Sequence, residues 1–260
     1  MHGVLLTTGL CLLLATTASS TRMVCVYDRV ASTRPSVGQF TPAMIDPTLC
    51  THIIFSSANI ETQEVVPFDS NDMTLYAQLN SLKNRNPQLK TLLSVGGPGF
   101  NNQMFSVAVS SSNNRNRFIT SAKALIKDNG FDGINLDWRH PGDADSQPMD
   151  PTRFLSLCQE LRAEFDKEVP ALLVSASVSA VRATIDSSYP DPSALASAMD
   201  FINVLTFNFH DPSESNTAHH SPLGALSSNP SDTRTTARTV LKMFNLYCFH
   251  SYIYSFVMHL

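Results

Sequence analysis

The run Phe-Asp-Gly-Ile-Asn-Leu-Asp-Trp-Arg-His-Pro-Gly at residues 131–142 alternates apolar and polar side chains. The apolar positions are Ile134, Leu136 and Trp138, and the polar positions between them are Asn135, Asp137 and Arg139. A period of two residues is typical of a β-strand, so the three polar side chains are predicted to share one face. Asp137 and Arg139 are then close enough to form an ion pair.

Strand-like and helix-like segments alternate along the rest of the chain. Apolar runs predict strands at 23–30, 51–57, 90–95, 133–138, 172–179 and 201–209. Helical periodicity predicts helices at 73–84, 116–128, 151–168 and 191–199. This alternation is typical of an α/β fold with a parallel sheet. A chain of 260 residues is long enough for one sizeable core.

Residues 131–142 resemble the signature of glycoside hydrolase family 18, the chitinases and chitinase-like lectins, which reads Asp-x-x-Asp-x-Asp-x-Glu. Asp132 and Asp137 match it, Asn135 replaces the middle Asp, and Arg139 stands in place of the catalytic Glu. The resemblance implies a (β/α)8 TIM barrel in which this run is the fourth strand. Its C-terminal end would open into the substrate cleft.

Further segments carry the same resemblance in the same order. Ser94-Val95-Gly96-Gly97 matches Ser-x-Gly-Gly at the end of the third strand, and residues 82–93 and 219–223 are similar to the vertebrate branch. Residues 201–210 resemble the sixth-strand segment Met-Thr-Tyr-Asp-x-His, whose Tyr and Asp hold the N-acetyl group of the reacting sugar. Phe207 and Asn208 replace them here.

The substitutions argue against hydrolysis. In this family the Glu protonates the glycosidic oxygen, and the substrate's own N-acetyl carbonyl is the nucleophile. A guanidinium with a pKa above about 12 cannot release a proton near neutral pH, so Arg139 cannot replace the Glu. No residue of the degenerate motif is expected to be competent: Asp132, Asn135, Asp137, Arg139. Asp132 and Asn135 are expected to support the strand through hydrogen bonds.

Sugar binding is expected to be weak at most. Chitinases stack sugar rings on Trp, and this chain has one Trp. Val30, Pro98 and Ser213 stand where the vertebrate family usually has others. The candidate residues for binding chitin or N-acetylglucosamine oligosaccharides are Asp137, Phe207, Asn208 and Trp138. Trp138 lies on the opposite strand face from Asp137, which favours packing over sugar contact. Two alternatives remain: an active chitinase using Asp137 as the acid, and an interaction or signalling protein without sugar binding.

Residues 1–20 predict a secretory signal peptide, because a short apolar run is followed by small residues. The run is shorter than the ~20 apolar residues of a membrane span. The expected location is therefore extracellular. A net charge of −4 gives no reason to expect a nucleic-acid partner. The family resemblance implies a disulfide between Cys25 and Cys50, whereas Cys158 falls in a helical pattern and is expected to be buried. No metal-ligand spacing is present, and no cofactor is expected.

Family likeness covers residues 21–244, which are expected to form an incomplete barrel of about six strands without the α+β insertion domain. Residues 245–260 form an atypical apolar tail without formal charge. It is interpreted as a read-through or alternative exon end, as a substitute seventh strand, or as a membrane or lipid-anchor signal. A barrel ending at its sixth strand would leave the first and sixth strands with unpaired edges.

Overall fold

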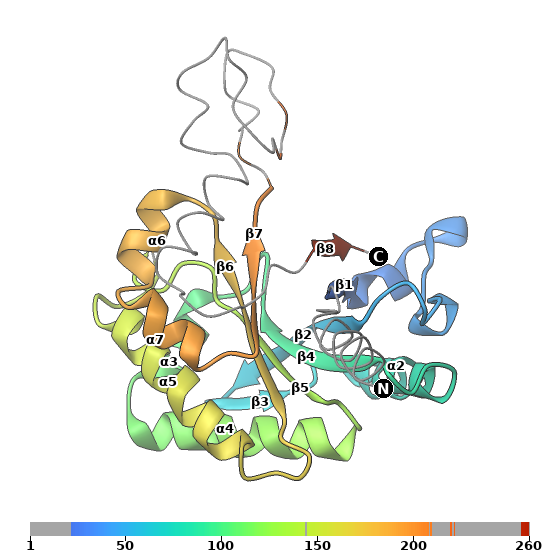
Figure 1. Cartoon of the computed structure of the whole chain (residues 1–260), viewed down its shortest axis with the longest axis horizontal. Helices are drawn as coiled ribbons and strands as arrows, with labels where there is room; N and C mark the ends of the chain where they lie inside the picture. The colour runs from blue at the N-terminus through green and yellow to red at the C-terminus, as the bar shows by residue number, and fades with distance from the viewer. Residues whose placement is uncertain are drawn as a thin grey trace, which may run out of the picture.

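The computed structural model describes residues 22–143, 145–207, 209, 219, 221 and 256–259. Its main feature is a curved parallel sheet with the strand order β7-β6-β5-β4-β2-β1-β8, and β3 pairs antiparallel with β2 (Figure 1). The strands are β1 (Met23–Asp28), β2 (His52–Glu61), β3 (Glu64–Val66), β4 (Lys90–Gly96), β5 (Gly133–Asp137), β6 (Leu173–Ser179), β7 (Phe201–Leu205) and β8 (Phe256–His259).

Helices follow the strands and cover the outside of the sheet. They are α2 (Asp72–Ser81), α3 (Asn102–Val109), α4 (Ser112–Asp128), α5 (Asp150–Phe165), α6 (Arg182–Ser188) and α7 (Pro192–Ser197). Short 3-10 helices are η1 (Arg29–Thr33), η2 (Ser36–Gly38), η3 (Pro42–Met44) and η4 (Leu82–Asn84). The described residues form an incomplete (β/α)8 barrel, which confirms the predicted fold class.

The pairing of β8 corrects one prediction about the sheet edges. β8 lies parallel to β1, with Met23 opposite Phe256 and Val26 opposite His259. The eighth strand of a closed barrel lies next to the first, so β8 takes that position. The first strand is therefore not an open edge over residues 23–26. Residues 256–259 of the tail thus form a strand, but at the place of the eighth strand and not of the seventh. β7 ends the other side of the described sheet.

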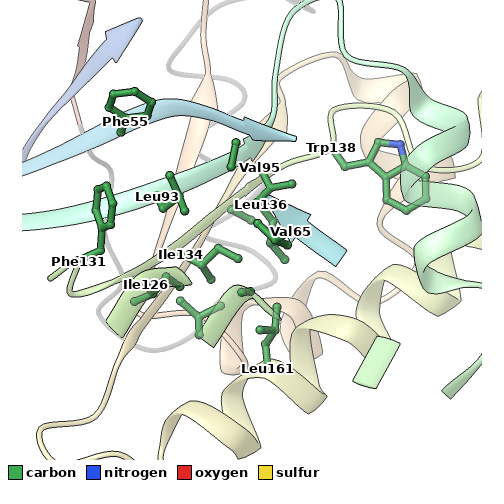
Figure 2. Packing of buried hydrophobic residues seen from close by; sticks show 14 of the residues in the cluster. Phe55, Val65, Leu93, Val95, Ile126, Phe131, Ile134, Leu136, Trp138 and Leu161 are labelled. Atoms are coloured by element: carbon green, nitrogen blue, oxygen red, sulfur yellow. The ribbon is translucent and has the colours of Figure 1, made fainter. Parts of the chain in front are cut away.

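The main core lies between the sheet and its helices. The outward face of β5 contributes Ile134, Leu136 and then Trp138, all at most 1% exposed, and Figure 2 shows them among side chains from neighbouring strands and helices. The alternation in the sequence predicted that these three apolar side chains share one face of the strand. The same core contains Cys158, which is buried as expected, and burial raises the pKa of its thiol.

The inward face of the sheet is apolar at one end and polar at the other. Val24, Ile54, Leu92 and Phe201 form a separate buried cluster toward the N-terminal ends of the strands. Further along the same strands the inward positions are polar, because parallel strands bring residues of equal register to the same level. This change places a polar floor beneath the C-terminal ends of the strands.

A disulfide ties the start of the first strand to the second. Cys25 in β1 is bonded to Cys50, with a Cα–Cα distance of 6.0 Å and a sequence separation of 25. The predicted bridge is confirmed. Closing a loop of this length stabilises the fold by roughly 3 kcal/mol.

Candidate functional site

A small cavity lies at the C-terminal ends of the strands, inside the curve of the sheet. Its volume is about 60 Å³, and its lining includes Asp28, Ser56, Asn135, Asp137, Arg139 and Asn203. A buried water needs about 10–15 Å³ by a comparable measure, so the cavity has room for a few waters or for one substituent of a sugar ring. This is the end of a β/α barrel at which binding and catalytic residues collect.

Asp137 and Arg139 form the predicted ion pair at the rim of this cavity. The Arg139 Nε lies 2.9 Å from Asp137 Oδ1, and its Nη2 lies 3.1 Å from Oδ2. A bidentate contact of this kind fixes both side chains. The buried Tyr189 hydroxyl donates to the backbone oxygen of Arg139 at 3.0 Å, so the residue is held at its main chain as well. Burial raises the pKa of the Tyr189 phenol, which therefore stays a neutral donor.

Asn135 is the centre of a buried hydrogen-bond network below the ion pair. Its Nδ2 donates to Ser94 Oγ at 2.9 Å and to Ser177 Oγ at 3.2 Å. Its Oδ1 accepts from Ser175 Oγ at 2.9 Å and from Asn203 Nδ2 at 3.2 Å. Both donors and both acceptor positions of the amide are used. Because an amide does not titrate, this network holds no proton for general acid catalysis.

The glycines of the Ser-x-Gly-Gly segment allow β4 to approach the end of β5. Gly96 has a φ of +95°, and a Cβ placed on it would lie 2.4 Å from the backbone oxygen of Asp137. The Gly97 N–H donates to that same oxygen at 3.0 Å. The segment therefore positions Asp137 by its backbone, and this role requires the absence of a side chain at position 96.

Two predicted site residues lie away from the cavity. Asp132 is at the opposite end of β5, where it accepts from the Thr91 N–H at 2.8 Å and pairs with Lys83 at 2.6 Å. It supports the strand, as expected. Trp138 is 1% exposed and stacks on Phe105 with centroids 5.0 Å apart. As a candidate sugar-binding residue, Trp138 therefore has no exposed ring face, because strand alternation turns it toward the helices.

The sixth-strand candidates are only partly described. Phe207 is half-buried two residues beyond β7 and is not among the residues that line the cavity. Asn208 lies outside the described residues. Of the three candidate binding residues that the structure describes, Asp137 alone lies on the cavity wall.

Asp28 is a cavity residue that the sequence analysis missed. It ends β1, and its Oδ1 accepts from the Val30 N–H at 3.1 Å as the cap of η1. An acidic residue at the C-terminal end of a barrel strand was the signal that could have found it. Among the described residues there is no group of three or more His, Cys, Asp or Glu side chains suited to a metal ion. Within the same part of the chain no helix is long and apolar enough to cross a membrane.

Comparison with known proteins agrees with this geometry. The family model of the glycosyl hydrolases family 18 matches residues 22–249. The chain is 38% identical to mouse chitotriosidase-1 over 217 residues, which cover 82% of this chain and 47% of the relative. It is also 38% identical to the mouse oviduct-specific glycoprotein over 244 residues, or 91% of this chain and 33% of the relative.

Two solved structures show the same fold. An immunomodulatory active chitinase from Trichuris suis superposes with a TM-score of 0.81 at 30% identity, covering 89% of this chain and 63% of that one. Human YKL-39, described as a pseudo-chitinase with retained chitooligosaccharide binding, superposes with a TM-score of 0.80 at 35% identity, covering 88% and 63%.

The chain belongs to glycosyl hydrolases family 18. It is a chitinase-like member with an incomplete barrel among its described residues, as the resemblance predicted. It spans between about a third and a half of the length of these curated relatives.

Proposed function

We propose that this chain is a secreted chitinase-like protein that binds N-acetylglucosamine oligosaccharides weakly and does not hydrolyse them. The observation that carries the proposal is the bidentate pair of Arg139 with Asp137 at the position where the family has its proton donor. A guanidinium cannot act as a general acid near neutral pH. The neutral Asn135 network beneath the pair supplies no substitute proton.

Two similar structures, one of an enzyme and one of a pseudo-enzyme, support the sugar-binding part of the proposal. One similar structure is an active chitinase, and another is a pseudo-chitinase with retained chitooligosaccharide binding. Polar groups that line the cavity here can hydrogen-bond sugar hydroxyls. The cavity is small, and the buried Trp138 offers no stacking surface, so weak affinity is the expected consequence.

Hydrolysis of a fluorogenic chitobioside by the purified chain and by Arg139→Glu tests the catalytic part. Neither protein is expected to show turnover above a no-enzyme blank. The substitution restores a carboxyl group. Phe207 still lacks the Tyr hydroxyl, and Asn208 lacks the Asp carboxylate, with which the family holds the N-acetyl group for attack. Circular dichroism of both proteins shows whether they are folded.

An active chitinase is the first competing function, and the same assay detects it. Turnover by the unmodified chain that disappears in Asp137→Asn would identify Asp137 as the acid and overturn the proposal. An interaction protein without sugar binding is the second competing function. Absence of binding to any N-acetylglucosamine oligomer in calorimetry or on a glycan array would favour it.

Secretion rests on the apolar leader at residues 1–20 and agrees with the Cys25–Cys50 bridge, which is typical of oxidising compartments. Expression of the full chain in cultured animal cells tests it. The expected product is found in the medium, lacks residues 1–20 by mass spectrometry of its N-terminal peptide, and contains the intact bridge. Retention of the leader, or of the whole protein inside the cell, would contradict the assignment.

A further inference from the structure

The charges around the cavity do not balance. Among the described residues that line it, Asp28, Asp137 and Arg139 carry a charge, and Arg139 is already engaged by both oxygens of Asp137. The described part of the lining is left with one formal negative charge, on Asp28. Among the described residues no Lys, Arg or His forms a salt bridge with Asp28, whose one hydrogen bond in this part of the chain is the η1 cap to Val30 N.

The nearest basic residue in the sequence does not neutralise Asp28. The Arg29 side chain turns to Asp69 and Asp72, with its Nε 2.8 Å from Asp72 Oδ1. Its guanidinium also lies 4.6 Å from the centroid of the Phe68 ring. Three partners thus hold Arg29 away from the half-buried Asp28.

Sugar substituents differ in how well they suit this cavity. An acetamido group is neutral and bulky, and it requires both a donor and an acceptor of hydrogen bonds. A protonated amine is compact, carries a positive charge and donates three hydrogen bonds, as an ammonium does. Asp28 and Ser56 both line the cavity of about 60 Å³, and carboxylate and hydroxyl groups are acceptors for such a donor.

We propose that the cavity selects glucosamine units with a free, protonated amine over N-acetylglucosamine units. This inference rests on the sugar binding proposed above and names its preferred ligand class. Asp28 is the specificity-determining residue, because it supplies the charge that a cationic sugar pairs with. The Asp137–Arg139 pair contributes hydrogen-bonding edges but no net charge. A carboxylate–ammonium contact at a partly solvated site corresponds to a preference of about 2- to 5-fold.

Isothermal titration calorimetry of the full chain with a glucosamine tetramer and an N-acetylglucosamine tetramer, in mildly acidic low-salt buffer, tests the proposal. The unmodified protein is expected to bind the glucosamine tetramer about 2- to 5-fold more tightly. Asp28→Asn is expected to bring the two affinities together, mainly by weakening the glucosamine complex. Asn caps a helix about as well as Asp, so this variant is expected to fold.

Asp46→Asn is the matched control. Asp46 also accepts a backbone N–H, from Thr48 at 2.9 Å, but it does not line the cavity. This variant loses the same formal charge and is expected to keep the preference, which excludes a general effect of net charge. Added salt should reduce the preference of the unmodified chain, because screening weakens exposed charge pairs.

The outcomes separate this inference from the function on which it rests. Tighter binding of the N-acetylated tetramer, or a preference that survives Asp28→Asn, overturns the inference and leaves sugar binding intact. Binding of neither tetramer overturns both.

Discussion

At the scale of single residues, the cavity depends on groups that carry no catalytic chemistry. Asn135 uses all four hydrogen-bonding positions of its amide inside the barrel. Gly96 lets the backbones of β4 and β5 meet at Asp137. Gly96 thereby affects the position of Asp137, and Asn135 affects the packing of the strands below it, so both act on the stability and shape of the site.

Gly96→Ala is expected to destabilise the protein by more than about 3 kcal/mol, because a new Cβ meets backbone atoms at 2.4 Å in a left-handed conformation. Gly99→Ala is the control. Gly99 also has a positive φ, of +74°, but nothing lies within 4 Å of its added Cβ, and the expected cost is about 1 kcal/mol. Urea unfolding of both variants measures the difference. Equal losses of stability would show that the close approach to β5 does not matter.

At the scale of secondary structure elements, the pairing of the outermost strands affects the stability of the incomplete barrel. β8 pairs with β1 over four residues and satisfies backbone groups that would otherwise face solvent. An unpaired parallel edge is a template for association with a second chain. β8 is short, so the protection it gives is local to the start of β1.

Deletion of residues 256–260 is expected to lower the melting temperature and to cause concentration-dependent association, because β1 becomes an edge strand. Deletion of Leu260 alone, which leaves all of β8, is the control and is expected to behave as the full chain does. Light scattering at several concentrations and thermal unfolding follow both effects. A monomeric deletion variant with an unchanged melt would show that β8 does not stabilise the sheet.

At the scale of the whole molecule, side chains connect the N-terminal ends of β1 and β7, which lie far apart in the sequence. Arg22 Nη1 donates to the backbone oxygen of Asp200 at 3.2 Å, and the Arg22 guanidinium lies 5.2 Å from the centroid of Phe201. His52 packs against the same ring at a centroid distance of 5.2 Å. Burial and the nearby Arg22 lower the pKa of His52 to about 4.

The low pKa of His52 predicts loss of stability in acid. The folded state favours neutral His52, whereas the unfolded state takes up a proton near pH 6.5. The stabilisation is therefore complete above pH 6.5 and is lost as the pH falls toward 4. The expected loss by about pH 5 is about 1–2 kcal/mol, since solvent reaches part of the ring.

Urea unfolding as a function of pH measures this slope. His52→Gln should reduce it, while His219→Gln, at an exposed position, should leave it unchanged. The assignment to His52 fails if the His52→Gln protein keeps the full slope between pH 6.5 and 4.

Local patterns in the sequence predicted most elements but missed several short ones. The strand expected at 133–138 and the helix expected at 116–128 correspond to β5 and α4, because a long amphipathic period is a local property. β3 was missed, since its hairpin turns at Thr62 and Gln63, both with positive φ, without the usual Asn-Gly signal. α3 and α6 were missed, whereas the six-residue α7 lies within the helix predicted at 191–199, because Asp191 and Pro192 mark its start in the sequence.

The sequence by itself determined the family, the α/β class and the presence of an arginine at position 139, because these depend on residue identity and on spacing along one strand. Only the tertiary structure decided that Asp28 shares a cavity with Asp137, that Trp138 is buried against Phe105, and that β8 lies beside β1. These are contacts between segments far apart in the chain. Their partners are fixed by the curvature and register of the sheet, which no local pattern encodes.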